Sequence, residues 1–239
     1  MNTTVPIVNQ IEQAVQPIPG WSPIDQLLTL FTLAYSSSDI PGDILELGSW
    51  CGRSAVALGM AARLSGKGKV HCIDLFPDKD DWYQNADGSY SFAVTIDGER
   101  YGAYQDQTVW EEPFLRDIKP MYERFQGTLD AFNIAIRNNG LDEYVVPYRN
   151  TLEGFARSVP SNFALRLAFI DGDHSFSAVS KDIEIVERFL LPNGWICFDD
   201  AFSSYEGVNE AIQRHVIDSG RYRNFQQMTR KCFVAQRRA

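Results

Sequence analysis

Two short apolar runs in the second half of the chain, at residues 165–170 and 195–198, each end in acidic residues. The polar side chains that follow them are Asp171, Asp173 and His174 after the first run, and Asp199 and Asp200 after the second. Carboxylates gathered in one place repel each other unless a positive group lies among them. If these acids converge, they mark a candidate functional site, with an imidazole beside them that could accept a proton.

The segment between the two runs predicts that the acids do converge. Its apolar residues recur with helical spacing, at Val179, Ile183, Val186 and Leu190. We expect Pro192-Asn193-Gly194 to end this helix before the second run begins. A strand, a helix and a second strand form a right-handed crossover, so the two strands are parallel and neighbours. Both acid groups then lie at the carboxyl edge of one sheet, where open α/β sheets bind ligands.

A second strand–helix–strand unit precedes this one in the chain. Ile44–Leu47 predicts a buried strand, Gly48–Gly52 a turn, Ser54–Leu64 a helix and Val70–Ile73 a second strand that ends in Asp74. A glycine loop that leads into a helix N-terminus, with an acid after the second strand, is typical of a nucleotide-type binding site.

The glycine spacing of this loop disfavours a dinucleotide. Dinucleotide-binding loops use G-x-G-x-x-G, so that the backbone can approach a pyrophosphate. Here the order is Glu46-Leu-Gly48-Ser-Trp50-Cys-Gly52, with a bulky tryptophan where a diphosphate would need room. A ligand without a diphosphate fits better, and the carboxylate of Asp74 can accept two hydrogen bonds from a ribose diol.

The remaining elements complete an α/β pattern. We expect one domain over residues 1–239, with about seven mostly parallel strands, an antiparallel C-terminal hairpin and helices on both faces. Its N-terminal helical segment is expected over residues 1–40. Residues 1–22 look irregular, with Pro17, Pro19 and Gly20 ending any helix begun at Val8–Val15, and a further helix begins at Ser22-Pro23. The later elements are expected at 129–138 (helix), 144–148 (strand), 152–159 and 208–217 (helices), and 224–228 and 231–236 (paired strands).

Residues 77–128 interrupt this alternation and are rich in aromatic side chains. A hairpin is expected around Ser89–Tyr101 and a helix around Pro113–Phe125. Two interpretations remain open: a surface insertion that packs only on itself, or a lid or substrate wall at the ligand edge of the fold.

Composition limits the class of partner. A formal net charge of −9 argues against nucleic-acid binding, because no basic surface is available to neutralise phosphates. No apolar run approaches membrane-spanning length, and the N-terminus lacks the basic and apolar regions of a signal peptide. The four cysteines show no C-x-x-C pair, so we expect a reduced, cytoplasmic protein without disulfides or zinc.

With these pieces in place, the sequence resembles the class I S-adenosylmethionine-dependent methyltransferases. The stretch ILELGSWCGRSA is similar to the cofactor loop of the catechol-type, metal-dependent O-methyltransferases. The run IPGDILELG, together with FIDGDHSFSAVSKDI and LLPNGWICFDD, resembles the macrocin-type sugar O-methyltransferases of antibiotic biosynthesis. The resemblance spans about Pro23–Asp74 and Leu129–Gln236 and leaves out the insertion.

The resemblance assigns roles to individual residues. It implies that S-adenosylmethionine is held by the loop and its neighbours: Glu46, Gly48, Ser49, Trp50, Gly52, Ser54 and Asp74. Asp171, Asp199 and Asp200 match three ligands of a divalent metal, Mg²⁺ or Mn²⁺, which suits an all-oxygen donor set. His174 matches the position of a general base. Asp173 could be a helper of His174, a fourth ligand or a cap for the following turn. Asp200 stands where the catechol branch has Asn.

These observations predict a metal-dependent O-methyltransferase that acts on a hydroxyl of a small molecule, either a sugar-containing natural product or a phenol. Three alternatives stay open: a metal-independent methyltransferase of a small amine or acid, a non-catalytic S-adenosylmethionine-binding protein, and a nicotinamide oxidoreductase, which the glycine spacing disfavours. A homo-oligomer is implied by the resemblance alone.

Overall fold

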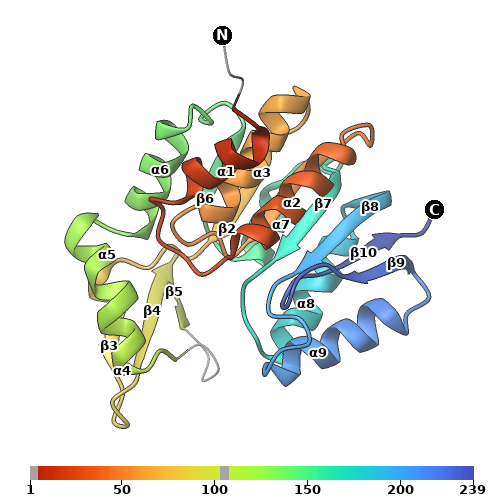
Figure 1. Cartoon of the computed structure of the whole chain (residues 1–239). Helices are drawn as coiled ribbons and strands as arrows, with labels where there is room; N and C mark the ends of the chain where they lie inside the picture. Colours follow the sequence, from red (N-terminus) through yellow and green to blue (C-terminus); the bar gives the residue numbers. More distant parts are fainter. Residues whose placement is uncertain (1–4, 103–107) are drawn as a thin grey trace.

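A computed structural model describes residues 5–102 and 108–239. Its centre is a seven-stranded sheet in the order β6-β2-β1-β7-β8-β10-β9 (Figure 1). The strands are β1 (Asp43–Leu47), β2 (Val70–Asp74), β6 (Val145–Arg149), β7 (Leu165–Ile170), β8 (Leu190–Phe198), β9 (Tyr222–Gln227) and β10 (Phe233–Arg237). The first five are parallel, and β10 runs antiparallel to both β8 and β9. The predicted fold class and C-terminal hairpin are confirmed.

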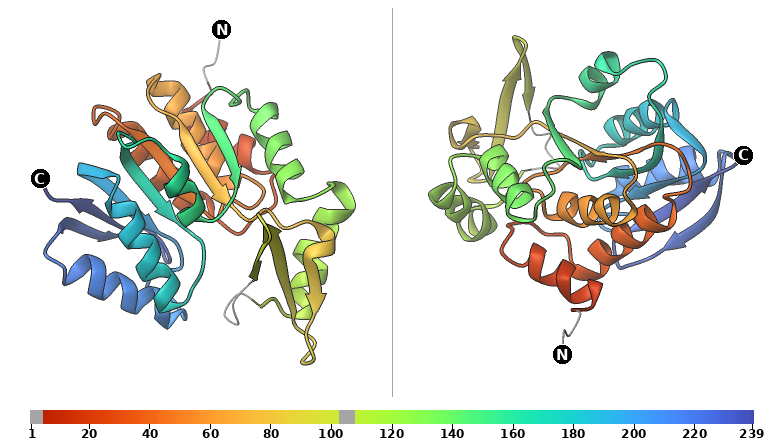
Figure 2. Two further views of the ribbon diagram at one scale, coloured as in Figure 1. Left: turned by 180° about the vertical axis from the view of Figure 1, so that it is seen from behind. Right: turned by 90° about the horizontal axis from the view of Figure 1, so that it is seen from above.

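Helices cover both faces of the sheet (Figures 1 and 2). One face carries α1 (Ile7–Val15), α2 (Ile24–Ser36), α3 (Arg53–Ser65) and α6 (Thr128–Asn138); the other carries α7 (Leu152–Ser158), α8 (Phe176–Glu187) and α9 (Glu206–Ile212). Each face of the sheet has its own hydrophobic core. Alternate residues of a strand contribute to the two cores, because successive side chains point to opposite faces. In β7, Leu167 and Phe169 join the first core, while Ala168 and Ile170 join the second.

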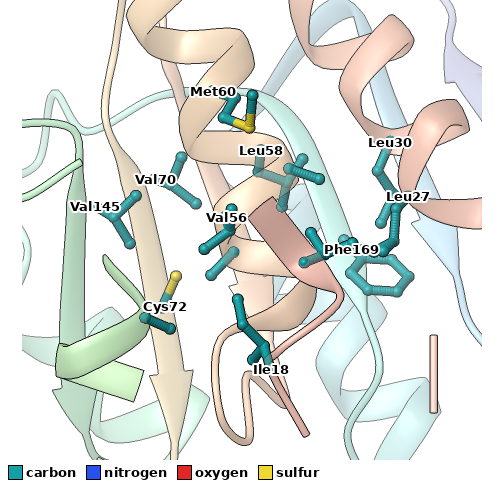
Figure 3. Close-up of a cluster of buried hydrophobic side chains, with 14 of the residues drawn as sticks. Ile18, Leu27, Leu30, Val56, Leu58, Met60, Val70, Cys72, Val145 and Phe169 are labelled. Atoms are coloured by element: carbon teal, nitrogen blue, oxygen red, sulfur yellow. The ribbon is translucent and has the colours of Figure 1, made fainter. Parts of the chain in front are cut away.

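The first core packs tightly around α3. Val56 and Leu58 of that helix are completely buried in one cluster with strand residues such as Val70 and Phe169 (Figure 3). Leu27 and Leu30 of α2 complete the cluster next to Phe169. This apolar layer fixes α3 on the sheet. It therefore also fixes the loop between β1 and α3, at the edge where the candidate ligand residues lie.

The helix that the sequence allowed at Val8–Val15 is present as α1, which buries Ile11 and Val15. One local prediction was wrong. Pro192-Asn193-Gly194 does not end the preceding helix; α8 already ends at Glu187, and the three residues lie inside β8. Asn193 has a φ of 66°, and the pairing of β7 with β8 shifts register between Leu165 and Leu167. The turn residues thus produce an irregularity within a strand instead of a loop.

The insertion forms a small separate layer at the β2–β6 end of the sheet (Figures 1 and 2). It consists of the three-stranded sheet β3 (Trp82–Gln84), β4 (Tyr90–Ile96) and β5 (Glu99–Gly102), and of α4 (Glu111–Pro113), a π-helical turn (Phe114–Ile118) and α5 (Lys119–Arg124). The predicted hairpin is present, with its turn at Asp97-Gly98. Its aromatic rings pack on one another, including Tyr90 on Phe114 with ring centroids 3.8 Å apart.

The carboxyl ends of β1 and β7 approach each other closely at Gly48. This glycine has a φ of +86°, and a Cβ atom added to it would lie only 1.8 Å from the carbonyl oxygen of Asp171. The amide of Asp171 donates to the carbonyl of Leu47 at 2.8 Å, which keeps the two strand ends in contact. Only glycine satisfies both the backbone conformation and the available space.

We therefore expect Gly48→Ala to destabilise the protein by about 2 to 4 kcal/mol, because left-handed strain and steric overlap add together. The matched control is Gly66→Ala. Gly66 has a similar φ of +66° but nothing within 4 Å of the added atom, so that variant should lose about 1 kcal/mol. Urea unfolding of both variants measures the difference, and equal losses would contradict the packing explanation.

Candidate active site

The structure brings the predicted acids together at the carboxyl edge of the sheet. Asp171 follows β7, and Asp199 and Asp200 follow β8. The amide of Asp199 donates to the carbonyl of Ile170 at 3.0 Å, so the two strand ends stay in register. One carboxylate oxygen from each of the three acids lies within 4.8 Å of the others. We call Asp171, Asp199 and Asp200 the acid cluster.

A lysine that sequence reasoning missed lies against the acid cluster. The Nζ of Lys231 is 2.7 Å from Oδ2 of Asp199 and 3.5 Å from Oδ1 of Asp200, and its side chain is only 17% exposed. Lys231 immediately precedes Cys232 and β10, whose antiparallel pairing with β8 places Phe233 opposite Phe198. If the sequence had indicated that β10 pairs with β8, Lys231 could have been predicted to lie beside the acids.

The charges of the site explain the directions of its pKa values. Burial raises the pKa of Asp171 well above its usual range, and repulsion from Asp199 and Asp200 raises it further. Burial also disfavours ionisation of Asp200, but contacts with His174 and Lys231 outweigh it and lower the pKa of that carboxyl. For Lys231, burial disfavours the charged form, yet attraction to Asp199 prevails and raises the pKa of the ammonium. Lys231 is therefore charged at neutral pH.

His174 lies at the edge of the acid cluster, as predicted. Its Nε2 is 3.2 Å from Oδ2 of Asp200, and its ring stacks on Tyr205 with centroids 3.9 Å apart. Close packing of Gly207 against the backbone at His174 and Ser175 holds this arrangement, because a Cβ on Gly207 would lie 2.4 Å from the carbonyl oxygen of His174. The imidazole of His174 is thus held by stacking on Tyr205 and by its contact with the carboxylate of Asp200.

Asp173 has a different environment from its neighbours. Its Oδ1 accepts a hydrogen bond from the amide of Ser175 at 2.6 Å, and the hydroxyl of Ser175 accepts from the amide of Ala178 at 3.3 Å as the N-cap of α8. Asp173 is not part of the acid cluster. Its position favours the capping role among the three that the sequence left open.

The glycine loop lies beside the acid cluster and is held by Asp74. The carboxylate of Asp74 accepts from the amide of Trp50 at 2.8 Å and from the amide of Phe76 at 2.6 Å. Burial raises the pKa of Asp74 despite these hydrogen bonds. Gly52, with a φ of +88°, leads directly into α3. The residues predicted to bind the cofactor therefore share one edge of the sheet with the predicted metal ligands.

Glu46 lies near the end of β1, just before this loop, and is completely buried. Burial raises the pKa of its carboxyl, while the neighbouring side chains of Ser49, Ser54 and Cys72 lower it. Ser49 and Ser54 are themselves buried. Both carboxylate oxygens of Glu46 lack a hydrogen-bond partner among the described residues. Glu46 is therefore a buried acid next to the loop, with Ser49 of the loop and Ser54 of α3 as polar neighbours.

The aromatic side chain of Trp50 connects the loop to two distant segments. Its ring centroid is 5.6 Å from that of Trp21, in the N-terminal segment, and 6.4 Å from that of Trp82, in the insertion. The guanidinium of Arg53 anchors the N-terminal segment by donating to the carbonyls of Val15, Ile18 and Ser22. Neither tryptophan contact could be predicted from sequence, because each joins elements far apart in the chain.

The acid cluster fits a divalent cation. Its donors are all carboxylate oxygens, which Mg²⁺ and Mn²⁺ prefer. Oδ1 of Asp199 is buried and has no hydrogen-bond partner within the described ranges, although its side chain is only 4% exposed. A buried carboxylate oxygen normally has a partner, so this atom is suited to contact a cation. A cavity of about 10 Å³, with room for about one water molecule, is lined by Asp171 and Asp199.

Comparison with known proteins identifies the family. A family model described as a methyltransferase domain matches residues 45–201, which is more than half of the chain and includes both the glycine loop and the acid cluster. The chain belongs to this methyltransferase family. The prediction of a class I methyltransferase is thereby confirmed.

Solved structures show that the methyltransferase shares its fold with several O-methyltransferases. The O-methyltransferase NovP is 15% identical with a TM-score of 0.63, over 90% of this chain and 81% of NovP. An O-methyltransferase from Bacillus cereus, solved in complex with SAH (S-adenosylhomocysteine), is 13% identical with a TM-score of 0.57, over 100% and 93%. CalS11, a TDP-rhamnose 3′-O-methyltransferase of calicheamicin biosynthesis, is 13% identical with a TM-score of 0.55, over 96% and 92%.

None of the helices in the described ranges combines the length and the apolar character needed to cross a bilayer.

The position of Asp74 generates a test of the cofactor site. We expect Asp74→Asn to weaken S-adenosylhomocysteine binding about tenfold or more, because the amide has only one acceptor oxygen for the loop amides and the ribose. The control is Asp39→Asn, at a carboxylate that is 97% exposed and paired with Lys67. Calorimetric titration of both variants measures the affinities, and an unchanged affinity for Asp74→Asn would remove Asp74 from the cofactor site.

Proposed function

We propose that this methyltransferase transfers the methyl group of S-adenosylmethionine to a hydroxyl of a small molecule, with Mg²⁺ or Mn²⁺ held by Asp171, Asp199 and Asp200. The observation that carries the proposal is the acid cluster, whose carboxylate oxygens lie within 4.8 Å of one another at the same sheet edge as the glycine loop. The buried Oδ1 of Asp199, which has no hydrogen-bond partner among the described residues, would be one of the ligand atoms.

In this proposal, the loop and Asp74 hold the cofactor. Gly48, Gly52 and Ser54 line the turn into α3, and Ser49 and Trp50 belong to the same turn. Asp74 would bind the ribose, and the bulk of Trp50 would lie near the methionine end. Much of the rate enhancement would then come from holding two reactants side by side.

The acceptor hydroxyl must lose its proton when the methyl group arrives. When bound, the divalent cation supplies positive charge that favours the deprotonated form of this hydroxyl. His174 would take the proton at Nδ1, because Nε2 faces the carboxylate of Asp200 at 3.2 Å and carries its hydrogen there. The same contact with Asp200 would stabilise the resulting imidazolium. Tyr205 keeps the imidazole in place by stacking on it. Asp173 would act only through the turn that it caps.

The acceptor side of the site is proposed to be an aromatic wall made of Trp21, Trp50 and Trp82. These rings come from the N-terminal segment, the cofactor loop and the insertion, and each lies within 6.4 Å of its neighbour. Aromatic faces suit both phenol rings and the apolar faces of sugars. The three similar proteins described above are all named as O-methyltransferases, and CalS11 among them as one that acts on a nucleotide-linked sugar, which supports a hydroxyl acceptor of this kind.

A metal-independent reaction is the second candidate, and Lys231 favours it. The ammonium of Lys231 already places one positive charge against the acid cluster. In that case the acids would serve to bind the acceptor and would not hold a metal.

Removal of divalent metal separates the two candidates. We expect a chelator to abolish methyl transfer to a hydroxyl acceptor and added Mg²⁺ to restore it, while S-adenosylhomocysteine still binds in the chelator. Transfer rates are measured with a panel of phenols and nucleotide-linked sugars, and cofactor binding by calorimetry. Full turnover in the chelator would contradict the metal role and leave the metal-independent reaction.

The role of His174 is tested by substitution. We expect His174→Gln to lower the transfer rate about 10² to 10⁴-fold, because proton transfer loses its acceptor, with little change in cofactor affinity. His215→Gln is the matched control, since His215 lies on the helical segment after α9 and outside the site. A His174 variant with the rate of the control would show that another group takes the proton.

A further inference from the structure

We propose that Lys231 is a tethered cation that competes with the divalent metal for the acid cluster, so that it orders the metal-free site and lowers its metal affinity. This inference takes the metal site from the proposed function and adds a residue that neither the family match nor the similar proteins assign. It follows from three features of the structure: the position of the ammonium, the atoms it contacts and the way its backbone is held.

The ammonium and the metal would use the same carboxylates. The Nζ of Lys231 lies 2.7 Å from Oδ2 of Asp199 and 3.5 Å from Oδ1 of Asp200, and both residues belong to the proposed metal ligands. A divalent cation at this cluster would therefore sit close to a like charge. Metal binding then requires Lys231 to withdraw from at least one carboxylate. If the ammonium stays in place, the metal binds against electrostatic repulsion from it.

The backbone around Lys231 delivers the ammonium to this position. The carbonyl of Lys231 accepts a hydrogen bond at 2.9 Å from the amide of Ala201, the residue after Asp199 and Asp200. The hydroxyl of Thr229 accepts from the amide of Cys232 at 3.1 Å, which shapes the turn before β10. A lysine fixed on a hairpin is present at high local concentration, so it occupies the cluster whenever no metal does.

The three carboxylates also need this charge when the metal is absent. Asp199 is 6% exposed, and burial of an unpaired carboxylate is costly unless an opposite charge or a proton compensates it. Lys231 provides the compensation and leaves Oδ1 of Asp199 without a partner. The metal-free site is thus kept folded with one donor atom already available for a metal.

The test is the Mn²⁺ affinity of Lys231→Met, measured by calorimetry and by the electron paramagnetic resonance signal of free Mn²⁺. We expect binding at least about tenfold tighter than in the wild type, because a like charge is removed from the site. We also expect a lower melting temperature for the metal-free variant and a larger rise when Mn²⁺ is added. Lys181→Met, at an exposed lysine paired with Glu153, is the control and should match the wild type.

Unchanged or weaker Mn²⁺ binding in a folded Lys231→Met variant would overturn the inference, because a merely structural lysine would not tighten binding when removed. If that variant does not fold, Lys231→Gln and the charge-preserving Lys231→Arg replace it. The first should tighten binding and the second should not. These outcomes are separate from the chelator experiment: a wild type that turns over without metal, alongside a tighter-binding Lys231→Met, would refute the metal role and still support the competition.

Discussion

The repulsion between three carboxylates at one sheet edge is the constraint on which the site depends. Asp171, Asp199 and Asp200 are brought together because β7 and β8 are parallel neighbours that end in register. Partly buried like charges cannot all ionise there without a compensating positive group. The protein meets this requirement with the ammonium of Lys231, and the same requirement makes the cluster a good receptor for a dication.

The cofactor loop and the acid cluster are coupled through backbone contact. Gly48 lies against the carbonyl of Asp171 so closely that no side chain fits between them. The loop is in turn tied to β2 by the hydrogen bonds of Asp74 and packed onto the sheet through α3. A methyl donor on one side and an acceptor hydroxyl on the other would therefore be held by one rigid edge, which is what transfer between two bound reactants demands.

Local and neighbouring-strand features could be predicted from the sequence, and long-range ones could not. The acids at Asp171, Asp199 and Asp200 were found because a crossover connection fixes where two consecutive strands end. Lys231 was missed because its position depends on β10 returning antiparallel beside β8, a pairing that apolar patterns alone do not specify. Pro192-Asn193-Gly194 was misplaced because its turn residues interrupt a strand that the neighbouring strands keep extended.

The same distinction applies to the acceptor side. The tryptophans at 21, 50 and 82 were each visible in the sequence, but their contacts join three segments that only the fold brings together. The N-terminal helix α1 could be outlined only weakly from the sequence for a related reason: its stability comes from burying Ile11 and Val15 in the core shared with α3 more than from its own sequence.

The most direct test of the central claim is a crystal structure of the protein with S-adenosylhomocysteine and Mn²⁺, with anomalous diffraction used to locate the metal. The account predicts an anomalous peak among the carboxylates of Asp171, Asp199 and Asp200, with the cofactor ribose on Asp74 and the Lys231 ammonium displaced from Asp199. A bound cofactor with no anomalous peak at saturating Mn²⁺, and with Lys231 still on Asp199, would contradict it.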